Sequence, residues 1–245
     1  MDASASPPIF DRSLDPTLVP GIYNYCDRRC HRCAFTARCL TYRDSRAELA
    51  ASDEEAAARS TAVARSLSRS FEVMRHIANR LGIDIDPAPE DDAAVQVRLA
   101  RDFDDPLVRR GREYARFTGG IVQALAPVLA ERRDEQLTEA VARIDETCAV
   151  IAARILRAMS GASHEWCDLS DPQDDANGSA KVARLLIAEA RRSWRVLMEA
   201  GRAAANGVPA RLVAALDELD RGLAARFPNA MQFVRPGFDE DSRER

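Results

Sequence analysis

Apolar residues recur along most of the chain at spacings of three and four, which is the period of an amphipathic helix. The clearest stripe repeats at intervals of 4, 3, 4, 3, 4 and 4 and consists of Leu137, Val141, Ile144, Cys148, Ile151, Ile155 and Met159. Cys148 occupies a stripe position, so we expect it to be a core residue rather than a ligand. The sequence therefore predicts one long helix that ends near Gly161.

Four further segments show the same period, and none shows the alternation of a half-buried strand. A stripe from Val63 to Leu81 follows a capping box at Ser52 and Glu55. The next helix is expected from Pro106 to about Glu131, with a core face of Tyr114, Phe117, Ile121 and Leu125. The last two stripes consist of Val182, Leu185, Leu186, Trp194, Leu197 and Met198, and of Leu212, Leu216, Leu219 and Leu223. We expect an all-α fold, a helical bundle of about five long helices.

Breaks in this pattern divide the chain into four parts. Residues 1–20 contain four prolines and no period, which predicts an extended N-terminal arm. Residues 21–46 form a cysteine-rich metal or iron–sulfur loop, and residues 47–226 form the helical bundle. Residues 227–245 are expected to be a C-terminal strap and tail, because Phe227, Phe233 and Phe238 suit packing across the bundle.

Composition narrows the possible classes of protein. The chain has 35 basic and 39 acidic side chains, a net charge of −4, which excludes a polycation that binds nucleic acid by bulk charge. The first ten residues lack the basic and apolar regions of a secretion signal. No apolar run approaches the roughly 18 residues of a membrane span. We expect a cytoplasmic, soluble chain with no membrane contact.

Four of the six cysteines lie within 14 residues, in the pattern C-x3-C-x2-C-x5-C formed by Cys26, Cys30, Cys33 and Cys39. A cytosolic chain seldom uses cysteines this closely spaced for disulfides, and the segment is too polar to bury them as small apolar residues. Metal or cluster binding is the remaining interpretation. Structural zinc sites usually pair two knuckles separated by a dozen residues or more, whereas compact thiolate sets hold iron–sulfur clusters. The spacing favours a [4Fe–4S] cluster, with zinc as the alternative.

The element from Cys30 to Cys39, C-x2-C-x5-C, resembles half of the [4Fe–4S] site of WhiB-like regulators and of RecB-like iron–sulfur nucleases. The resemblance covers about ten residues. It implies that Cys30, Cys33 and Cys39 are cluster ligands. Cys26 is assigned as the fourth ligand from its spacing alone.

The cysteine segment is also basic: residues 26–46 hold six Arg against two Asp, a local net charge of +4. Four thiolates on a [4Fe–4S]2+ core carry a charge of −2, which nearby guanidinium groups would stabilise. The same patch, with interleaved tyrosines, could contact the phosphates of a nucleic acid.

The connection from Gly161 to Gly178 is long and polar, a kind of loop that is often functional. It contains His164 and Cys167 at ligand-like spacing. Gly178, Ser179 and Lys181 then open a helix, where backbone amides and a lysine can hold an anion. Lys181 is the only lysine in the chain. We expect these three residues to bind an anion on the side of the bundle that carries the cysteine loop.

Taken together, the patterns predict an iron–sulfur protein for electron transfer or redox sensing, with an unidentified redox or regulatory protein partner. The alternative is a module in which zinc or a cluster organises a surface that binds a protein or a nucleic acid. No catalytic constellation stands out, so the sequence leaves open whether the chain is an enzyme.

Overall fold

The computed structural model describes residues 15–51, 75, 92–132, 134–200 and 207–239. Within these ranges the protein is all-α, with six α-helices, four short 3-10 turns and no strand, which confirms the expected fold class. The stripe expected from Val63 to Leu81 lies outside the described residues, apart from Arg75.

The chain forms two compact units whose boundary differs from the expected one. The N-terminal unit comprises Met1–Tyr23 and Cys30–Asp92, and the four-helix unit comprises Asn24–Arg29 and Ala93–Arg245. Residues 93–226 of the expected bundle fall in the four-helix unit, and most of residues 47–92 lie outside the described residues. The cysteine segment is also divided, because Cys26 belongs to the four-helix unit while the other three clustered cysteines belong to the N-terminal unit.

In the N-terminal unit, residues 15–19 of the expected arm lie along the cysteine segment. The amide of Val19 donates to the carbonyl of Arg38 at 3.0 Å, and the Arg38 side chain donates to the Thr17 carbonyl at 3.2 Å. Arg43 forms an ion pair with Asp15 at 3.1 Å. Helix α2 (Leu40–Ala51) begins directly after the last clustered cysteine, seven residues earlier than the helical pattern suggests.

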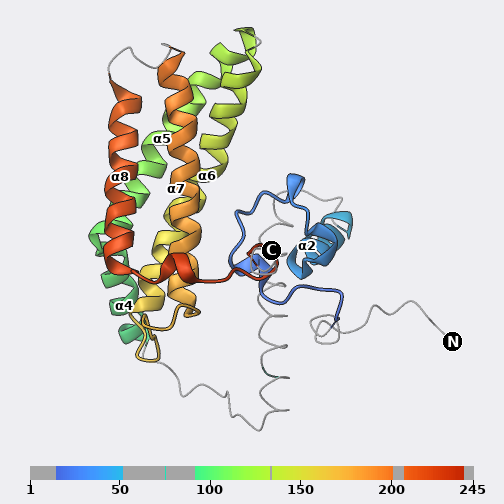
Figure 1. Cartoon of the computed structure of the whole chain (residues 1–245), viewed down its shortest axis with the longest axis vertical. Helices are drawn as coiled ribbons and strands as arrows, with labels where there is room; N and C mark the ends of the chain where they lie inside the picture. The colour runs from blue at the N-terminus through green and yellow to red at the C-terminus, as the bar shows by residue number, and fades with distance from the viewer. Residues whose placement is uncertain (1–14, 52–74, 76–91, 133, 201–206, 240–245) are drawn as a thin grey trace, which may run out of the picture. The chain divides into compact units, whose positions relative to one another are not determined.

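Four long helices make up the body of the second unit: α5 (Pro106–Arg132), α6 (Glu135–Ala162), α7 (Asp175–Glu199) and α8 (Val208–Arg226). Each packs against the next, and α8 packs against α5 (Figure 1). The shorter α4 (Asp92–Asp104) precedes them. The Asp105 carboxylate accepts the amide of Leu107 at 2.8 Å, so α5 begins at Pro106 as the sequence predicts. The described part thus contains four of the five expected long helices, and the fifth, expected from Val63 to Leu81, lies outside the described residues.

Helix α6 provides the central apolar face of this core, and all seven residues of its predicted stripe are buried. Cys148 is among them, as expected, with 5% of its surface exposed. Trp194 on α7 is fully buried and donates its indole N–H to the Tyr114 hydroxyl at 3.2 Å, which links α7 to α5. The expectation that Trp194 and Tyr114 are core residues is therefore confirmed.

The predicted face of α5 is wrong at Phe117, whose ring is 59% exposed. The residues that α5 buries are Val108, Gly111, Tyr114, Thr118 and Val122. A Cβ atom at Gly111 would lie 3.0 Å from Cδ1 of Ile155, so a glycine here lets α5 approach α6 closely. The buried face of α5 includes small and polar residues, which a search for large apolar side chains overlooks.

Helix α7 begins at Asp175, three residues before Gly178, the first of the three residues expected to open it. The Asp174 side chain caps the helix by accepting the amide of Ala176 at 2.8 Å. Gly178 therefore lies in the first turn of the helix, where its amide donates to the Asp174 carbonyl at 3.1 Å. A Cβ atom at Gly178 would lie 2.5 Å from the Tyr25 ring and 2.7 Å from the Phe233 ring. A glycine is needed here because two aromatic rings cover the helix.

We expect Gly178→Ala to lower the free energy of unfolding by about 1–3 kcal/mol, because the added methyl group displaces two packed rings. Gly120→Ala on α5 is the matched control, since a Cβ atom there meets nothing within 4 Å. That substitution is expected to raise stability by about 0.5–1 kcal/mol through helix propensity alone. Urea unfolding of both variants measures the two changes in stability. Equal changes at Gly178 and Gly120 would contradict the close packing of the two rings on Gly178.

Residues 227–239 are the described part of the segment expected to be a C-terminal strap and tail, and they pack against the four-helix unit. Phe227 and Phe233 are buried, and Val234 and the Gln173 side chain exchange two hydrogen bonds of 2.7 and 3.4 Å. In Figure 1 this segment, in red, crosses the end of the helices.

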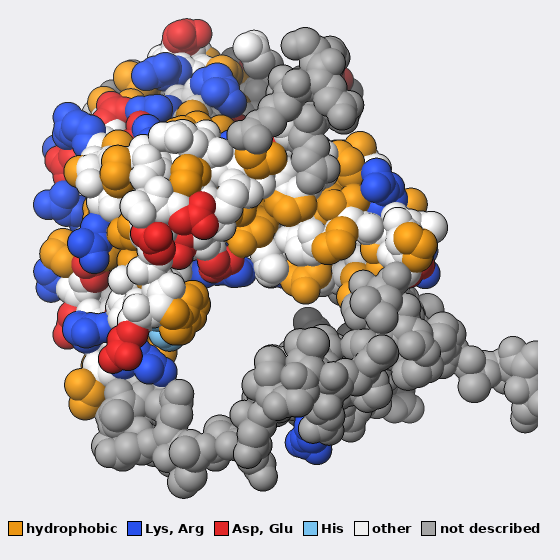
Figure 2. All heavy atoms as spheres, turned by 60° about the horizontal axis from the view of Figure 1, so that its bottom comes forward, with side chains coloured by type: hydrophobic (Ala, Val, Ile, Leu, Met, Phe, Trp, Pro, Cys, Tyr) orange, Lys and Arg blue, Asp and Glu red, His pale blue; other side chains and the backbone are white. Residues whose placement is uncertain are grey.

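On the face drawn in Figure 2, Lys and Arg side chains are interspersed with those of Asp and Glu. Ion pairs account for several of the arginines: Arg184 pairs with Asp220 and Arg191 with Asp217, at 2.8 and 2.6 Å, and both pairs join α7 to α8. No described helix combines the length and apolarity needed to cross a bilayer.

Candidate metal centre and the segment that carries Cys26

The cysteines of the N-terminal unit lie at the ends of two consecutive 3-10 turns, Cys30–Arg32 and Thr36–Arg38: Cys30 begins the first, Cys33 directly follows it, and Cys39 directly follows the second. The Cys33 amide donates to the Cys30 carbonyl at 3.3 Å, and the Cys39 amide donates to the Thr36 carbonyl at 3.4 Å. Cys30 is exposed, Cys33 and Cys39 are half-buried, and none of them forms a disulfide. These thiols are therefore neither buried as apolar residues nor cross-linked.

One sulfur already accepts a backbone hydrogen bond. The amide of Phe35 points at Sγ of Cys33 at 3.4 Å. Amide hydrogen bonds to sulfur stabilise the thiolate form and are among the interactions that tune the potential of an iron–sulfur cluster. The donor set therefore has the chemistry of a thiolate-held metal or cluster.

The structure does not gather these thiols into a ligand set. Across the described ranges, no three His, Cys, Asp or Glu side chains converge closely enough to hold a metal ion. The assignment of Cys26, Cys30, Cys33 and Cys39 as ligands thus rests on their chemistry and their spacing in the sequence.

The segment Asn24–Arg29, which carries Cys26, is anchored within the four-helix unit. The guanidinium of Arg154 on α6 donates to the carbonyl of Cys26 at 2.8 Å and to the carbonyl of Asn24. The Tyr25 hydroxyl donates to Asp175 at 2.7 Å, and its ring lies 4.5 Å from that of Phe233. The backbone on both sides of Cys26 is therefore fixed by side chains of α6 and α7.

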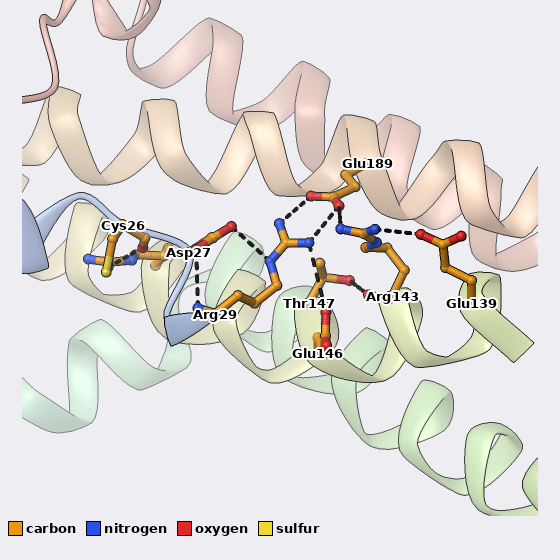
Figure 3. A network of polar contacts seen from close by, with 9 residues as sticks. Cys26, Asp27, Arg29, Glu139, Arg143, Glu146, Thr147 and Glu189 are labelled. Carbon is orange, nitrogen blue, oxygen red and sulfur yellow. Dashed lines mark hydrogen bonds and ion pairs between the residues drawn. The ribbon is translucent and has the colours of Figure 1, made fainter. Parts of the chain in front are cut away.

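Arg29 anchors the other end of this segment between α6 and α7 (Figure 3). Only 8% exposed, it donates two hydrogen bonds of 2.6 and 2.5 Å to the Glu189 carboxylate and one of 2.8 Å to Asp27. Glu146 lies 3.8 Å away, and Arg143 contacts Glu189 at 3.0 Å from the opposite side. The expectation that Arg29 belongs to a basic patch around the cysteines is wrong, because its charge is neutralised within the four-helix unit.

The pKa of the Glu189 carboxyl reflects this environment. Burial acts to raise that pKa, but hydrogen bonds and charge from Arg29, together with the charge of Arg143, more than offset burial and lower it below its ordinary value. Glu189 is therefore ionised at neutral pH and forms a stable partner for Arg29.

Arg28, between these anchors, adopts a left-handed backbone with φ of 62°. A residue with a side chain takes this conformation at a cost of about 1–2 kcal/mol. The contacts of Arg29 and Cys26 on its two sides hold the chain in this turn.

The residues expected to bind an anion have internal roles instead. Lys181 is 9% exposed, and its ammonium donates to the Phe233 carbonyl at 2.6 Å and to Asp239 at 2.8 Å. Gly178 and Ser179 are buried in the first turn of α7. Gly178 does face the segment that carries Cys26, through Tyr25, but Lys181 serves to fasten the strap. The Lys181 ammonium is thus engaged by a carbonyl and a carboxylate of the chain itself.

Side-chain hydrogen bonds hold the connection between α6 and α7 in place. The Asn177 amide donates to the carbonyls of Leu169 and Asp171 at 3.2 and 2.8 Å. Cys167 contacts Asp174 at 3.6 Å, and burial together with that carboxylate raises the pKa of its thiol. His164 stacks on the exposed ring of Trp166 at 4.7 Å. His164 and Cys167 belong to no group of three possible metal ligands within the described ranges.

Sequence reasoning missed Arg29, Arg154 and Glu189 as the residues that fix the Cys26 segment. The one local signal is that Arg154 lies between Ile151 and Ile155 of the buried α6 stripe, where a charge is unusual. The partners of these residues lie more than 100 positions away in the sequence, so no local pattern could connect them.

Comparison with known proteins gives no match: no protein family, no curated protein and no solved structure is similar to this chain. Functional conclusions therefore rest on the residues alone.

Proposed function

We propose that this chain binds a [4Fe–4S] cluster through Cys26, Cys30, Cys33 and Cys39 and acts in electron transfer or redox sensing. The observation that carries the proposal is the density of the cysteines: all four lie within a stretch of 14 residues, none forms a disulfide, and each is at least partly exposed. Partly exposed cysteines at this density are typical of thiolate ligands.

Residues of this chain would perform two tasks at such a centre. The Phe35 amide stabilises negative charge on the Cys33 sulfur. Arg154 fixes the backbone at Cys26 by donating to its carbonyl at 2.8 Å. When bound, the cluster supplies one-electron redox chemistry, and the hydrogen bonds and charges around it set its potential.

The second candidate is a zinc-organised module that binds a protein or nucleic-acid partner. It is favoured by the position of Cys39, which directly precedes helix α2, because a metal ligated there would stabilise the start of that helix. Two arginines of the basic segment have internal partners: Arg43 pairs with Asp15, and Arg29 with Glu189. The charge left for a phosphate backbone is correspondingly smaller, so we favour a protein partner.

Absorption of anaerobically purified protein separates the two candidates. We expect a brown protein with broad absorption near ~400 nm that bleaches on reduction, as thiolate-held iron–sulfur clusters do. A colourless protein that retains zinc through gel filtration would establish the zinc-organised module instead.

A further inference from the structure

Helices α5 and α8 leave a groove of about 640 Å³ between them on the surface of the four-helix unit. Its apolar wall consists of Tyr114, Phe117 and Ile121 of α5 and of Val208, Leu212 and Ala215 of α8. Four exposed charged side chains, two Arg and two Glu, stand at its rim. An apolar centre with a charged rim is the usual composition of an interface between protein chains.

The α5 wall of the groove belongs to the apolar stripe that the sequence pattern predicts to be buried. Tyr114 is buried, but Phe117 is 59% exposed. Ile121 and Leu125 are only half-buried. Removing an exposed aromatic ring from water is favourable by about 25 cal/mol per Å² of apolar surface. The four-helix unit by itself therefore leaves in water a part of the stripe that an amphipathic helix normally buries.

The charges at the rim indicate which partner fits the groove. Arg110 and Glu218 pair with each other at 3.3 Å, which joins α5 to α8. The other two rim residues are Glu113 on α5 and Arg211 on α8, and within the described part of the chain neither forms an ion pair. A strongly acidic or strongly basic partner would repel one of these two charges. The complementary partner offers a positive charge to Glu113 and a negative charge to Arg211.

A second copy of this surface supplies both charges and an apolar side chain. In a two-fold symmetric contact the same patch serves on both sides, so it must be complementary to itself. When the axis runs along the groove, α5 of one copy faces α8 of the other. Glu113 of each copy then lies opposite the partner's Arg211, and each Phe117 ring enters the facing groove.

We propose that the chain forms a two-fold symmetric dimer through the groove between α5 and α8, with Phe117 as the apolar anchor and Glu113 and Arg211 as reciprocal charge pairs. The dimer does not depend on the metal centre, because none of the four proposed cysteine ligands is among the described residues that line the groove. Aromatic residues at the centre of an interface are those whose removal weakens association most.

Sedimentation equilibrium of the full-length chain tests the apolar anchor, in a reducing buffer that prevents disulfide-linked dimers. We expect the wild type to be a dimer at micromolar concentrations. Phe117→Ala should raise the dissociation constant about 30-fold or more, the effect of removing an interface anchor. Trp166→Ala is the matched control: its ring is 71% exposed but does not line the groove, so the dissociation constant should stay within about two-fold of the wild-type value.

Reversal of the rim charges tests the symmetry of the contact. Glu113→Arg and Arg211→Glu each place like charges opposite one another at two positions in the dimer, and each should raise the dissociation constant about ten-fold. The variant that carries both substitutions has opposite charges at these positions again. Its dissociation constant should return to within about three-fold of the wild-type value.

Weaker association of Phe117→Ala together with recovery in the double charge variant supports the proposal. A wild type that stays monomeric at about 100 µM overturns it. Fluorescence of an apolar dye that depends on Phe117 would then show that the groove takes a small molecule instead. A dimer that Phe117→Ala leaves intact uses another surface and also overturns the proposal, as does a double charge variant no tighter than the single ones. These results do not depend on metal content, so the dimer and the proposed function fail separately.

Discussion

Glu189→Gln lowers the free energy of unfolding by about 3 kcal/mol, because it leaves the buried guanidinium of Arg29 without its main counter-charge. The pair is joined by two hydrogen bonds of 2.6 and 2.5 Å, and Arg29 and Glu189 are 8% and 20% exposed. Urea unfolding at neutral pH measures the loss. Glu218→Gln is the control: its ion pair with Arg110, at 3.3 Å, is half-exposed on both sides and should contribute less than about 0.5 kcal/mol.

The pH dependence of the same variant has a definite sign. Because the pKa of Glu189 is lowered in the folded protein from an ordinary value of 4.5, its contribution to stability is complete above that value and declines as pH falls. The stability difference between wild type and Glu189→Gln should therefore shrink in acid. If Glu189→Gln and Glu218→Gln lost equal amounts of unfolding free energy, the Arg29–Glu189 pair would not contribute as proposed. The same conclusion would follow if the stability difference between wild type and Glu189→Gln did not change with pH.

Cys33→Ser abolishes metal or cluster binding while the helical signal of the protein is retained. The substitution removes one of four proposed ligands and the sulfur that accepts the Phe35 amide. The core of the four-helix unit contains none of the three cysteines of the N-terminal unit, so its helices do not depend on them. Metal analysis and far-ultraviolet circular dichroism of the same sample measure the two effects.

Cys148→Ala is the control for this prediction, because Cys148 is a core residue whose thiol donates to the Asp145 carbonyl at 3.3 Å. It should keep its full metal content and lose about 1 kcal/mol of stability. Unchanged metal content in Cys33→Ser would remove that cysteine from the ligand set. Loss of helicity in that variant would show instead that folding of the helices depends on the metal.

The helices that sequence predicts best are those whose buried faces consist of large apolar residues. The stripe of α6 and the four leucines of α8 are all buried, because a period of three and four with Leu and Ile determines which face packs inward. The buried face of helix α5 does not consist of large apolar residues alone. Gly111 and Thr118 are part of that buried face, whereas Phe117 is exposed on the surface.

The sequence predicts only those parts of the candidate site whose residues lie close together along the chain. The spacing of the four cysteines is such a pattern, and it supports the ligand proposal without any coordinates. The anchoring of Cys26 is not local: Arg29 and Glu189 are 160 residues apart, and arginines are too frequent in this chain for one of them to stand out. Lys181 is the only lysine in the sequence, which suggests an anion site, but its ammonium donates to the Phe233 carbonyl of the C-terminal strap.

The most direct test of the proposed cluster is a count of iron and acid-labile sulfide per chain in protein purified without oxygen. A [4Fe–4S] centre held by Cys26, Cys30, Cys33 and Cys39 predicts about four iron and about four sulfide per chain. About one zinc per chain, with no iron and no sulfide, would contradict the cluster and leave the zinc-organised module as the function of this segment.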